Sequence, residues 1–365
     1  MKDKEKILYI MHVDWGWIKQ RPHFLAEGLN KFYDLLVMYR FNPIRKHMIK
    51  NDSDVKKLPL LTIPRRFGRF FEKMDDFIQI IWITMVSLVF KPQKIWLTFP
   101  SQYKYIPKKL LKKVELIYDC MDDCKEFYDD PKRKKDIEFL EKELIKNART
   151  ILCSSRHLGD VLENRYGKLD NLCLVRNGLK EEFISSRSMA ENVKSIFQKN
   201  EGIKDVVYIG TIANWINFQT IDKCLDENKN VRFHFIGPVD YQPQLVNSDK
   251  VIFHGPIEHS RLIENKELYD VLIMPFIRNE LIESVDPVKL YEYIAFEKPI
   301  ISVYYPEIER FNDYVYFYKN QQEFFELIKK INFNDLETKF EKELGHAFLE
   351  NNTWSKRVES IVEKI

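Results

Sequence analysis

One helix start carries the residue types needed to hold a nucleotide. The segment Asp286–Tyr293 reads DPVKLYEY, with Pro287 near the first turn of the expected helix. Amide donors at this helix end, together with the Lys289 ammonium, would hold a diphosphate. Glu292, one turn later, could accept hydrogen bonds from both hydroxyls of a ribose. A Lys and a Glu three residues apart also form surface ion pairs, so the spacing alone leaves both interpretations open.

The loop after the apolar run Ile7–Val13 reads DWGWIKQRPH. Gly16 permits close approach of a ligand to the backbone, and the following helix offers its amino end to an anion. Trp15 and Trp17 lie in a polar segment, where they can stack on the apolar face of a sugar or pack between two domains. This loop is therefore a second candidate binding segment.

Three carboxylates crowd the end of another expected strand, in the segment YDCMDD. Close carboxylates raise one another's pKa and can supply a general base or an anionic stabiliser. Asp119 lies nearest the strand end and is the preferred catalytic candidate. Asp122 is the second candidate, and a helix N-cap is the alternative role for Asp122 or Asp123.

The elements that must position these residues alternate between apolar runs and helical patterns. This alternation predicts an α/β protein with parallel sheets covered by helices on both faces. In such sheets ligands bind beyond the carboxyl ends of the strands, where all three candidate segments begin. Neither half contains a GxGxxG motif, so the usual dinucleotide-binding signature is absent. The expected strands are residues 7–13, 34–39, 94–99, 114–119, 150–154, 205–209, 232–236, 251–254, 271–274 and 299–303.

A chain of 365 residues exceeds the size of one hydrophobic core, which predicts two domains. The composition, 45% hydrophobic and 14% aromatic, is that of a globular protein and excludes disorder. Residues 181–204 lack a strong strand and mark a shift in charge, so we place the linker there. The first domain is expected at 1–184 and the second at 185–345.

Five cysteines without paired metal-ligand spacing argue against a zinc site and fit free thiols in a reducing compartment. The short apolar run at the amino end is too brief for a signal peptide. These features predict a cytoplasmic protein.

Positive charge is concentrated in the first half, with 17 basic and 5 acidic residues between Arg40 and Lys113. Such a surface suits an anionic partner. Within it, Phe77–Phe90 has no charge but is too short to span a bilayer, and Arg65, Arg66 and Arg69 precede it. The stretch is either a core helix or a helix that enters an anionic membrane interface. Nucleic acid is not expected, because no known binding motif accompanies the charge.

Several segments together resemble GT-B glycosyltransferases, particularly glycosyltransferase family four and its relatives in capsule and teichuronic-acid synthesis. They are PVKLYEYIAFEKPII, preceded by YDVLIMPF, and WGWIKQRPHFLAEGL, YDCMDD, VVYIGTIANWIN and NNTWSKRVESIVEKI. The usual form of the first is close to P-x-K-x-x-E-Y-x-A-x-G-K-P. Two positions depart from the family pattern. Ser284 stands where the family's first carboxylate is expected, eight residues before Glu292, and Glu297 replaces the usual glycine.

The resemblance implies a GT-B fold, in which two Rossmann-like domains face a central cleft and a carboxy-terminal helix, residues 346–365, packs back on the first domain. It also implies roles for individual residues. Asp119 and Asp122 would occupy the catalytic loop. Donor contacts would come from Gly210, Thr211, His254, Gly255, Val288, Lys289, Leu290 and Glu292. Contacts to the acceptor and the reacting sugar would come from Trp15, Gly16, Gln20 and Arg21.

The function expected from this resemblance is transfer of a sugar from a nucleotide-diphosphate sugar, UDP-sugar first, to a lipid-linked or cell-surface polysaccharide acceptor. No metal and no cofactor are expected, since a helix amino end and basic side chains take the charge of the leaving diphosphate. Retention of configuration is implied by the resemblance, and inversion with Asp119 or Asp122 as base is the competing route. An inactive sugar-binding scaffold and a nucleotide-sugar 2-epimerase are the alternative functions.

Overall fold

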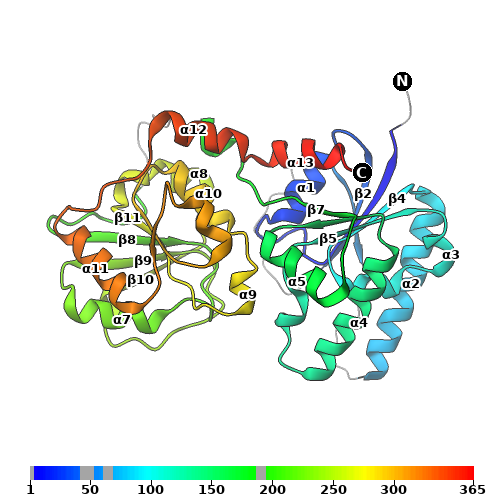
Figure 1. Ribbon diagram of the computed structural model, residues 1–365, viewed down its shortest axis with the longest axis horizontal. Coiled ribbons are helices and arrows are strands. Elements are labelled where there is room, and N and C mark those ends of the chain that lie inside the picture. Colours follow the sequence, from blue (N-terminus) through cyan, green and yellow to red (C-terminus); the bar gives the residue numbers. More distant parts are fainter. Residues whose placement is uncertain (1–3, 42–52, 61–68, 186–194) are drawn as a thin grey trace. The chain divides into compact units, whose positions relative to one another are not determined.

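The computed structural model describes residues 4–41, 53–60, 69–185 and 195–365. The chain divides into two compact units (Figure 1). Unit 1 comprises Met1–Asn177 together with Trp354–Ile365, and unit 2 comprises Gly178–Thr353. The predicted linker begins just after this division. Arg65 and Arg66, singled out for their charge, lie outside the described residues.

Unit 1 is built on a seven-stranded parallel sheet with the order β3-β2-β1-β4-β5-β6-β7. The strand order reverses direction between β1 and β4. Helix α1 therefore covers one face, whereas the helices that follow β3 cover the other. The strands are β1 (Lys6–Met11), β2 (Asp34–Arg40), β3 (Lys56–Leu60), β4 (Lys94–Leu97), β5 (Glu115–Cys120), β6 (Thr150–Cys153) and β7 (Leu172–Leu174).

The helices of unit 1 begin where local chemistry favours them. Asp130 accepts a hydrogen bond from the Lys132 amide at the start of α4, and Ser155 does the same for the Leu158 amide in α5. Near the chain's end, α13 returns to pack on α1, where the rings of Phe24 and Trp354 stack 4.9 Å apart. The helices are α1 (Arg21–Leu29), α2 (Arg69–Phe90), η2 (Pro100–Tyr105), α3 (Lys108–Leu111), η3 (Cys124–Phe127), α4 (Pro131–Asn147), α5 (Arg156–Tyr166) and α13 (Trp354–Val362).

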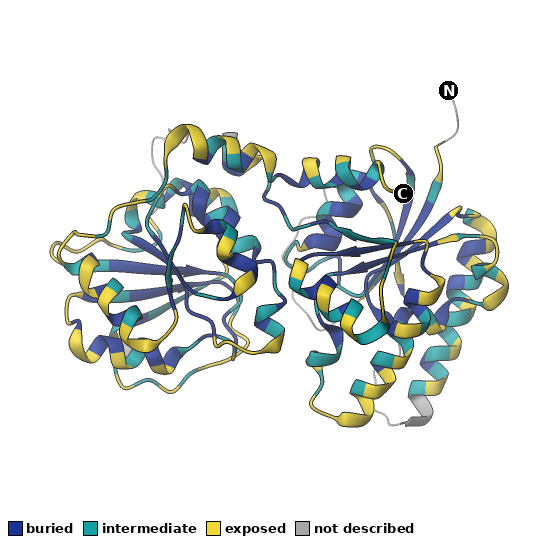
Figure 2. Ribbon diagram, in the orientation of Figure 1, coloured by how far each residue is buried: buried dark blue, intermediate teal, exposed yellow. Residues whose placement is uncertain are grey.

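Unit 2 contains a six-stranded parallel sheet with the order β10-β9-β8-β11-β12-β13. Its central strands are almost wholly buried and form the core with the helices around them (Figure 2). The strands are β8 (Lys204–Ile209), β9 (Val231–Ile236), β10 (Val251–Gly255), β11 (Val271–Met274), β12 (Ile300–Val303) and β13 (Tyr316–Tyr318). The helices are α6 (Glu182–Ser185), α7 (Phe218–Glu227), η4 (Ser248–Lys250), α8 (His259–Glu264), η5 (Lys266–Leu268), α9 (Glu280–Glu283), α10 (Val288–Ala295), η6 (Pro306–Phe311), α11 (Gln321–Asn332) and α12 (Lys342–Asn351).

The predicted α/β class with parallel sheets is confirmed, and three strands that the sequence did not reveal are β3, β7 and β13. All three lie at sheet edges, where a strand is only partly covered. Strand β3, with the sequence KKLPL, shows the reason: lysines and a proline are tolerated at an edge, so the strand lacks the continuous apolar run that marks a central one. In the described part of the chain, no helix is both long enough and apolar enough to cross a membrane.

Candidate functional site

The carboxyl ends of three neighbouring strands in unit 2 carry glycines that pack backbone against backbone. Gly210 follows β8, Gly237 follows β9, and Gly255 ends β10. The Gly237 amide donates to the Gly255 carbonyl at 2.9 Å. A Cβ atom on Gly237 would lie 2.0 Å from the Gly210 carbonyl oxygen, and both residues have φ of +147°. The close approach of the two backbones therefore requires glycine at position 237, and the positive φ favours glycine at position 210 as well.

Lys289 runs directly across Gly210. A Cβ atom on Gly210 would lie 2.0 Å from Lys289 Cε and 2.7 Å from Nζ. The ammonium lies 5.7 Å from the ring centroid of Tyr208 and 5.9 Å from that of Phe276. Burial lowers the pKa of Lys289, and the nearby charge of Glu292 partly opposes this. Because no ion pair or hydrogen bond of its side chain is seen among the described residues, this cation is suited to an anionic ligand.

The first turn of α10 adds amide donors to this cation. The Val288 and Lys289 amides occupy the helix start, where no intrahelical acceptor exists. The Leu290 amide instead donates to the Pro287 carbonyl at 3.2 Å, and the Leu290 side chain is fully buried. Thus Val288 and Lys289, not Leu290, present the free donors among the predicted residues.

A buried cluster fixes where α10 begins. The Arg310 guanidinium pairs with the buried Asp286 carboxylate and donates to the Tyr291 hydroxyl at 2.8 Å. The Tyr291 hydroxyl in turn donates to Asp286 at 3.2 Å. On the next turn, the Tyr293 hydroxyl accepts from the Ile209 amide at 2.8 Å, which ties the helix to the end of β8. These contacts hold the Lys289 backbone beside Gly210.

Glu292 lies on the same helix and is partly buried. In the described ranges its carboxylate makes no ion pair and no hydrogen bond. The alternative interpretation, a surface ion pair between Lys289 and Glu292, is therefore not what the structure shows. Both oxygens of Glu292 remain available as acceptors.

The two departures from the family pattern have structural explanations. The buried Ser284 hydroxyl donates to the Leu281 carbonyl at 2.7 Å, within the turn that ends α9. Glu297 takes the left-handed conformation, with φ of 60°, just beyond the end of α10. This is the conformation for which glycine is favoured. Glu297 thus ends the helix in the way the usual glycine would, at some backbone cost.

His254 is held by a polar chain that the sequence analysis did not find. Its Nε2 lies 2.9 Å from His234 Nδ1, and His234 Nε2 lies 3.0 Å from the buried Asp205. Asp205 also pairs with Arg232 at 2.7 Å. Burial, followed by the neighbouring His234, lowers the pKa of His254 to about 4, so its imidazole is neutral at pH 7. The signal in the sequence was the alternation in VRFHFI, which places Arg232 and His234 on one face of a buried strand.

In unit 1, Arg21 and Asp119 form a buried ion pair. Arg21 Nη2 and Nε donate to Asp119 Oδ1 at 2.8 and 3.0 Å, and both side chains are almost fully buried. Arg21 Nη1 also donates to the Val175 carbonyl at 2.7 Å. The pair therefore joins the start of α1 to the ends of β5 and β7. Asp119, the preferred catalytic candidate, is 0% exposed and already has a cationic partner.

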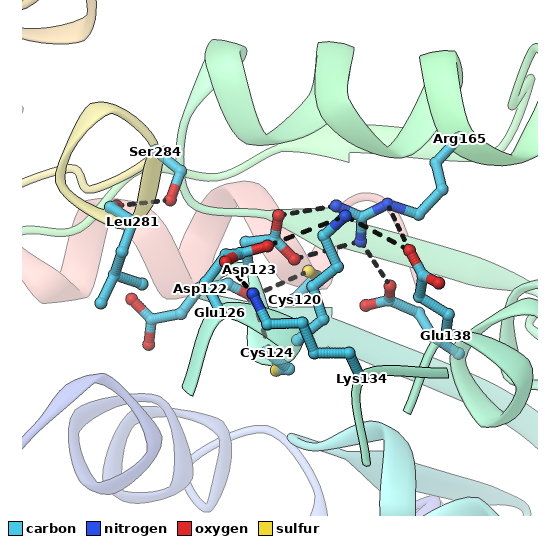
Figure 3. A network of polar contacts seen from close by, with 12 residues as sticks. Cys120, Asp122, Asp123, Cys124, Glu126, Lys134, Glu138, Arg165, Leu281 and Ser284 are labelled. Atoms are coloured by element: carbon cyan, nitrogen blue, oxygen red, sulfur yellow. Dashed lines mark hydrogen bonds and ion pairs between the residues drawn. The ribbon is translucent and has the colours of Figure 1, made fainter. Parts of the chain in front are cut away.

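The other two carboxylates of this loop differ from each other (Figure 3). Asp123 accepts from Arg165 at 3.0 and 2.6 Å, in a network that also includes Glu141. It stands at the N-cap position of η3, but its side chain makes no capping hydrogen bond. No partner for the Asp122 carboxylate is seen in the described part of the chain. Burial raises the pKa of Asp122 to about 6; Arg21 opposes this rise, and Asp119 and Asp123 add to it.

The tryptophan loop packs mainly within unit 1. Trp15 is buried between Lys57, whose ammonium lies 4.9 Å from the indole, and the His23 ring at 5.2 Å. The Gly16 amide donates to the Asp14 carboxylate at 2.9 Å. Gln20 is exposed, and its backbone N–H donates to His23 Nδ1 at 3.1 Å. The buried Trp15 offers little ring surface for stacking on a sugar, whereas Gln20 is open to contact.

This architecture defines a class of protein, the GT-B fold. Sucrose-phosphate synthase from Thermosynechococcus elongatus has a TM-score of 0.74 at 12% identity, covering 98% of each chain. HepE from Anabaena, solved in complex with UDP, has a TM-score of 0.68 at 11% identity, again covering 98% of each chain. At these identities the similarity shows the fold. No protein-family model matches the chain.

A sequence relative points to the activity. TuaH from Bacillus subtilis (strain 168), which its name assigns provisionally as a teichuronic acid biosynthesis glycosyltransferase, is 28% identical over 354 residues, covering 87% of this chain and 86% of TuaH. The predicted resemblance to GT-B glycosyltransferases is therefore confirmed. The chain is an enzyme of the glycosyltransferase class.

Proposed function

We propose that this enzyme transfers a sugar from a UDP-sugar to a lipid-linked or cell-surface polysaccharide acceptor in the cytoplasm. The observation that carries the proposal is the partly buried Lys289 ammonium, which lies across Gly210 without an anionic partner in the described residues. The UDP in the HepE complex supports the donor class, and the teichuronic acid biosynthesis in the name of TuaH supports the acceptor class.

In the proposed donor complex, the diphosphate lies over Gly210 and Thr211. The Lys289 ammonium and the free amides at the start of α10 neutralise it. The interaction of these donors with the diphosphate strengthens most when the bond to the sugar breaks, because negative charge then builds up on the leaving diphosphate. In this proposal the Lys289 ammonium and the helix amides take the role that a metal ion would have in this step.

Glu292 would accept hydrogen bonds from the two ribose hydroxyls, one turn beyond Lys289. His254 and Gly255 would lie by the nucleobase, with the neutral imidazole held in place by His234. A nucleotide that lacks the 2′-hydroxyl should then bind more weakly, since one oxygen of the Glu292 carboxylate would lose its partner.

We propose retention of configuration, with the donor phosphate helping to deprotonate the acceptor hydroxyl. One observation favours the inverting alternative: Asp122 lacks a partner in the described chain and has a pKa of about 6, as suits a general base. Asp119 and Arg21 are better suited to positioning the loop, because their side chains form an ion pair with each other. The anomeric configuration of the product, read by NMR, distinguishes the two routes.

The proposed function is tested by release of nucleoside diphosphate from a panel of nucleotide sugars, with and without membrane lipid extract. The variants are Glu292→Gln and, as the matched control at the other end of the same helix, Glu297→Gln. We expect UDP release that rises with lipid extract, falls at least about tenfold in Glu292→Gln and is unchanged in the control.

Release of no nucleotide from any donor, together with no thermal stabilisation by any donor, would favour the inactive scaffold. A product in which the sugar is changed but not transferred would instead identify a nucleotide-sugar 2-epimerase.

A further inference from the structure

Helix α2 presents an apolar face to solvent. Five side chains on this face are between 41% and 84% exposed, although all are apolar. Their spacing of four, four, three and one residues places them along one side of a helix. They are Phe77, Ile81, Met85, Leu88 and Val89. We call this set the α2 stripe.

The opposite side of α2 already supplies the contacts that hold the helix on unit 1. Ile83 and Val86 are buried in the core of unit 1, with Trp82 packed against it. The Trp82 indole also donates to the Pro59 carbonyl at 3.1 Å. Figure 2 shows buried and exposed residues alternating along this helix. The α2 stripe is therefore not needed for the fold, and a row of large exposed apolar side chains indicates a binding surface.

Cations outnumber carboxylates around the α2 stripe, although Glu72 lies in the first turn of the helix and Asp75 is buried in it. Lys73 precedes the stripe and Lys91 follows it, and both are exposed without an ion pair in the described residues. The nearby Asp76 is neutralised by Lys104 at 2.6 Å. Lys104 belongs to η2, and the next helix along the chain is α3. In and just after α3, four further lysines are exposed: Lys108, Lys109, Lys112 and Lys113.

We propose that the α2 stripe docks this enzyme on an anionic lipid bilayer, with α2 lying in the interface and the lysines contacting lipid phosphates. An exposed apolar helix face in a region where exposed lysines are in excess has the pattern of an interfacial helix. A second copy of the chain fits less well. If two copies paired their stripes with the helices antiparallel, Lys73 would lie near Lys91 of the other copy. If the helices were parallel, each lysine would lie near its own copy. Both arrangements bring like charges together.

This inference deepens the proposed function and rests on it, because a lipid-linked acceptor is presented at a bilayer surface. Docking through α2 would bring the enzyme to its acceptor without a membrane-spanning segment. The sequence left a core helix and an interfacial helix open for Phe77–Phe90, and the structure shows a helix with one buried face and one exposed apolar face.

The test is co-sedimentation of the full chain with vesicles of phosphatidylglycerol or of phosphatidylcholine. The variant combines Phe77→Gln, Leu88→Gln and Val89→Gln, all at exposed positions, so folding should be preserved. The control is Phe139→Gln on α4, which is 64% exposed, similar to Phe77 at 63%. We expect wild type to bind phosphatidylglycerol vesicles, the triple variant to bind at least about tenfold more weakly, and the control to match wild type.

Equal binding by wild type and the triple variant would overturn the proposal, as would absence of wild-type binding to phosphatidylglycerol. A wild-type dimer in light scattering that the triple variant converts to a monomer would assign the face to a second copy. Donor hydrolysis without lipid separates docking from catalysis. The triple variant should hydrolyse donor like wild type, and Glu292→Gln should bind vesicles like wild type. Absence of donor hydrolysis in wild type, with vesicle binding retained, would refute the proposed function and leave docking intact.

Discussion

Replacing Gly210 by alanine should displace the Lys289 ammonium from the proposed diphosphate site. The added Cβ atom would lie 2.0 Å from Lys289 Cε. Reaching an ordinary contact of 3.4 Å requires a shift of 3.4 − 2.0 = 1.4 Å. Lysine can make this shift at small cost, because the crowded atoms are at the end of a flexible side chain. We expect the same shift to move the ammonium away from the proposed diphosphate position.

The cost to binding and the cost to stability can be separated. A hydrogen bond to a charged group contributes about 1.5 to 3 kcal/mol, so UDP should bind about 10- to 100-fold more weakly to Gly210→Ala. A non-glycine residue with φ of +147° also costs about 1 to 3 kcal/mol of folding stability. The matched control is Gly202→Ala, where φ is +77° but no atom lies within 4 Å of the added Cβ. It carries backbone strain without touching Lys289.

The assay is calorimetric titration of UDP into wild type and both variants, with urea unfolding of each. We expect both variants to lose stability and only Gly210→Ala to lose UDP affinity. Wild-type UDP affinity in Gly210→Ala would refute the placement of Lys289 over this glycine as the diphosphate contact. Equal losses of affinity in both variants would show that strain, and not the displaced cation, is responsible.

The two loop aspartates of unit 1 give further predictions. The folded pKa of Asp122, about 6, is above the usual 3.8, so its stabilising contribution is present below pH 3.8 and is lost as pH rises through 6. Asp122→Asn should therefore be about 1 to 2 kcal/mol more stable than wild type at pH 8 and equal at pH 3.5, as measured by urea unfolding. If Asp122 is the general base, kcat/KM of wild type rises with pH through about 6, and a flat profile would exclude that role. Asp119→Asn should destabilise unit 1 by about 3 to 5 kcal/mol, because it leaves the buried Arg21 guanidinium without a counter-charge; the double variant Asp119→Leu, Arg21→Met should recover much of this loss in the same assay.

The comparison of Asp119 with Asp122 shows where reasoning from sequence stops. Position relative to the strand end favoured Asp119, and the strand was placed correctly. The partner that occupies Asp119 is Arg21, 98 residues away in the sequence. An ion pair between such distant residues leaves no local pattern. Asp122 is therefore the preferred candidate for a catalytic carboxylate, because no described residue pairs with its side chain.

Helix α10 is the opposite case, because its site residues follow a local pattern in the sequence. A proline, a lysine and a glutamate at fixed offsets are local features, because helix geometry alone places them on neighbouring turns. Lys289 and Glu292 were predicted on that basis. Their spacing also fitted a surface ion pair, and only the contact between Lys289 and Gly210, 79 residues apart, shows that the ammonium is turned towards the sheet edge.

The sequence by itself determined the parallel sheets, the helix starts and the residue types at the strand ends, because periodicity and capping act over a few residues. Tertiary structure alone decided which charges are paired, which glycines permit close approach, and which face of α2 is left uncovered. These depend on contacts between residues far apart in the chain. The edge strands belong to the same group, since a strand such as β3 forms only where a neighbouring strand offers its hydrogen bonds.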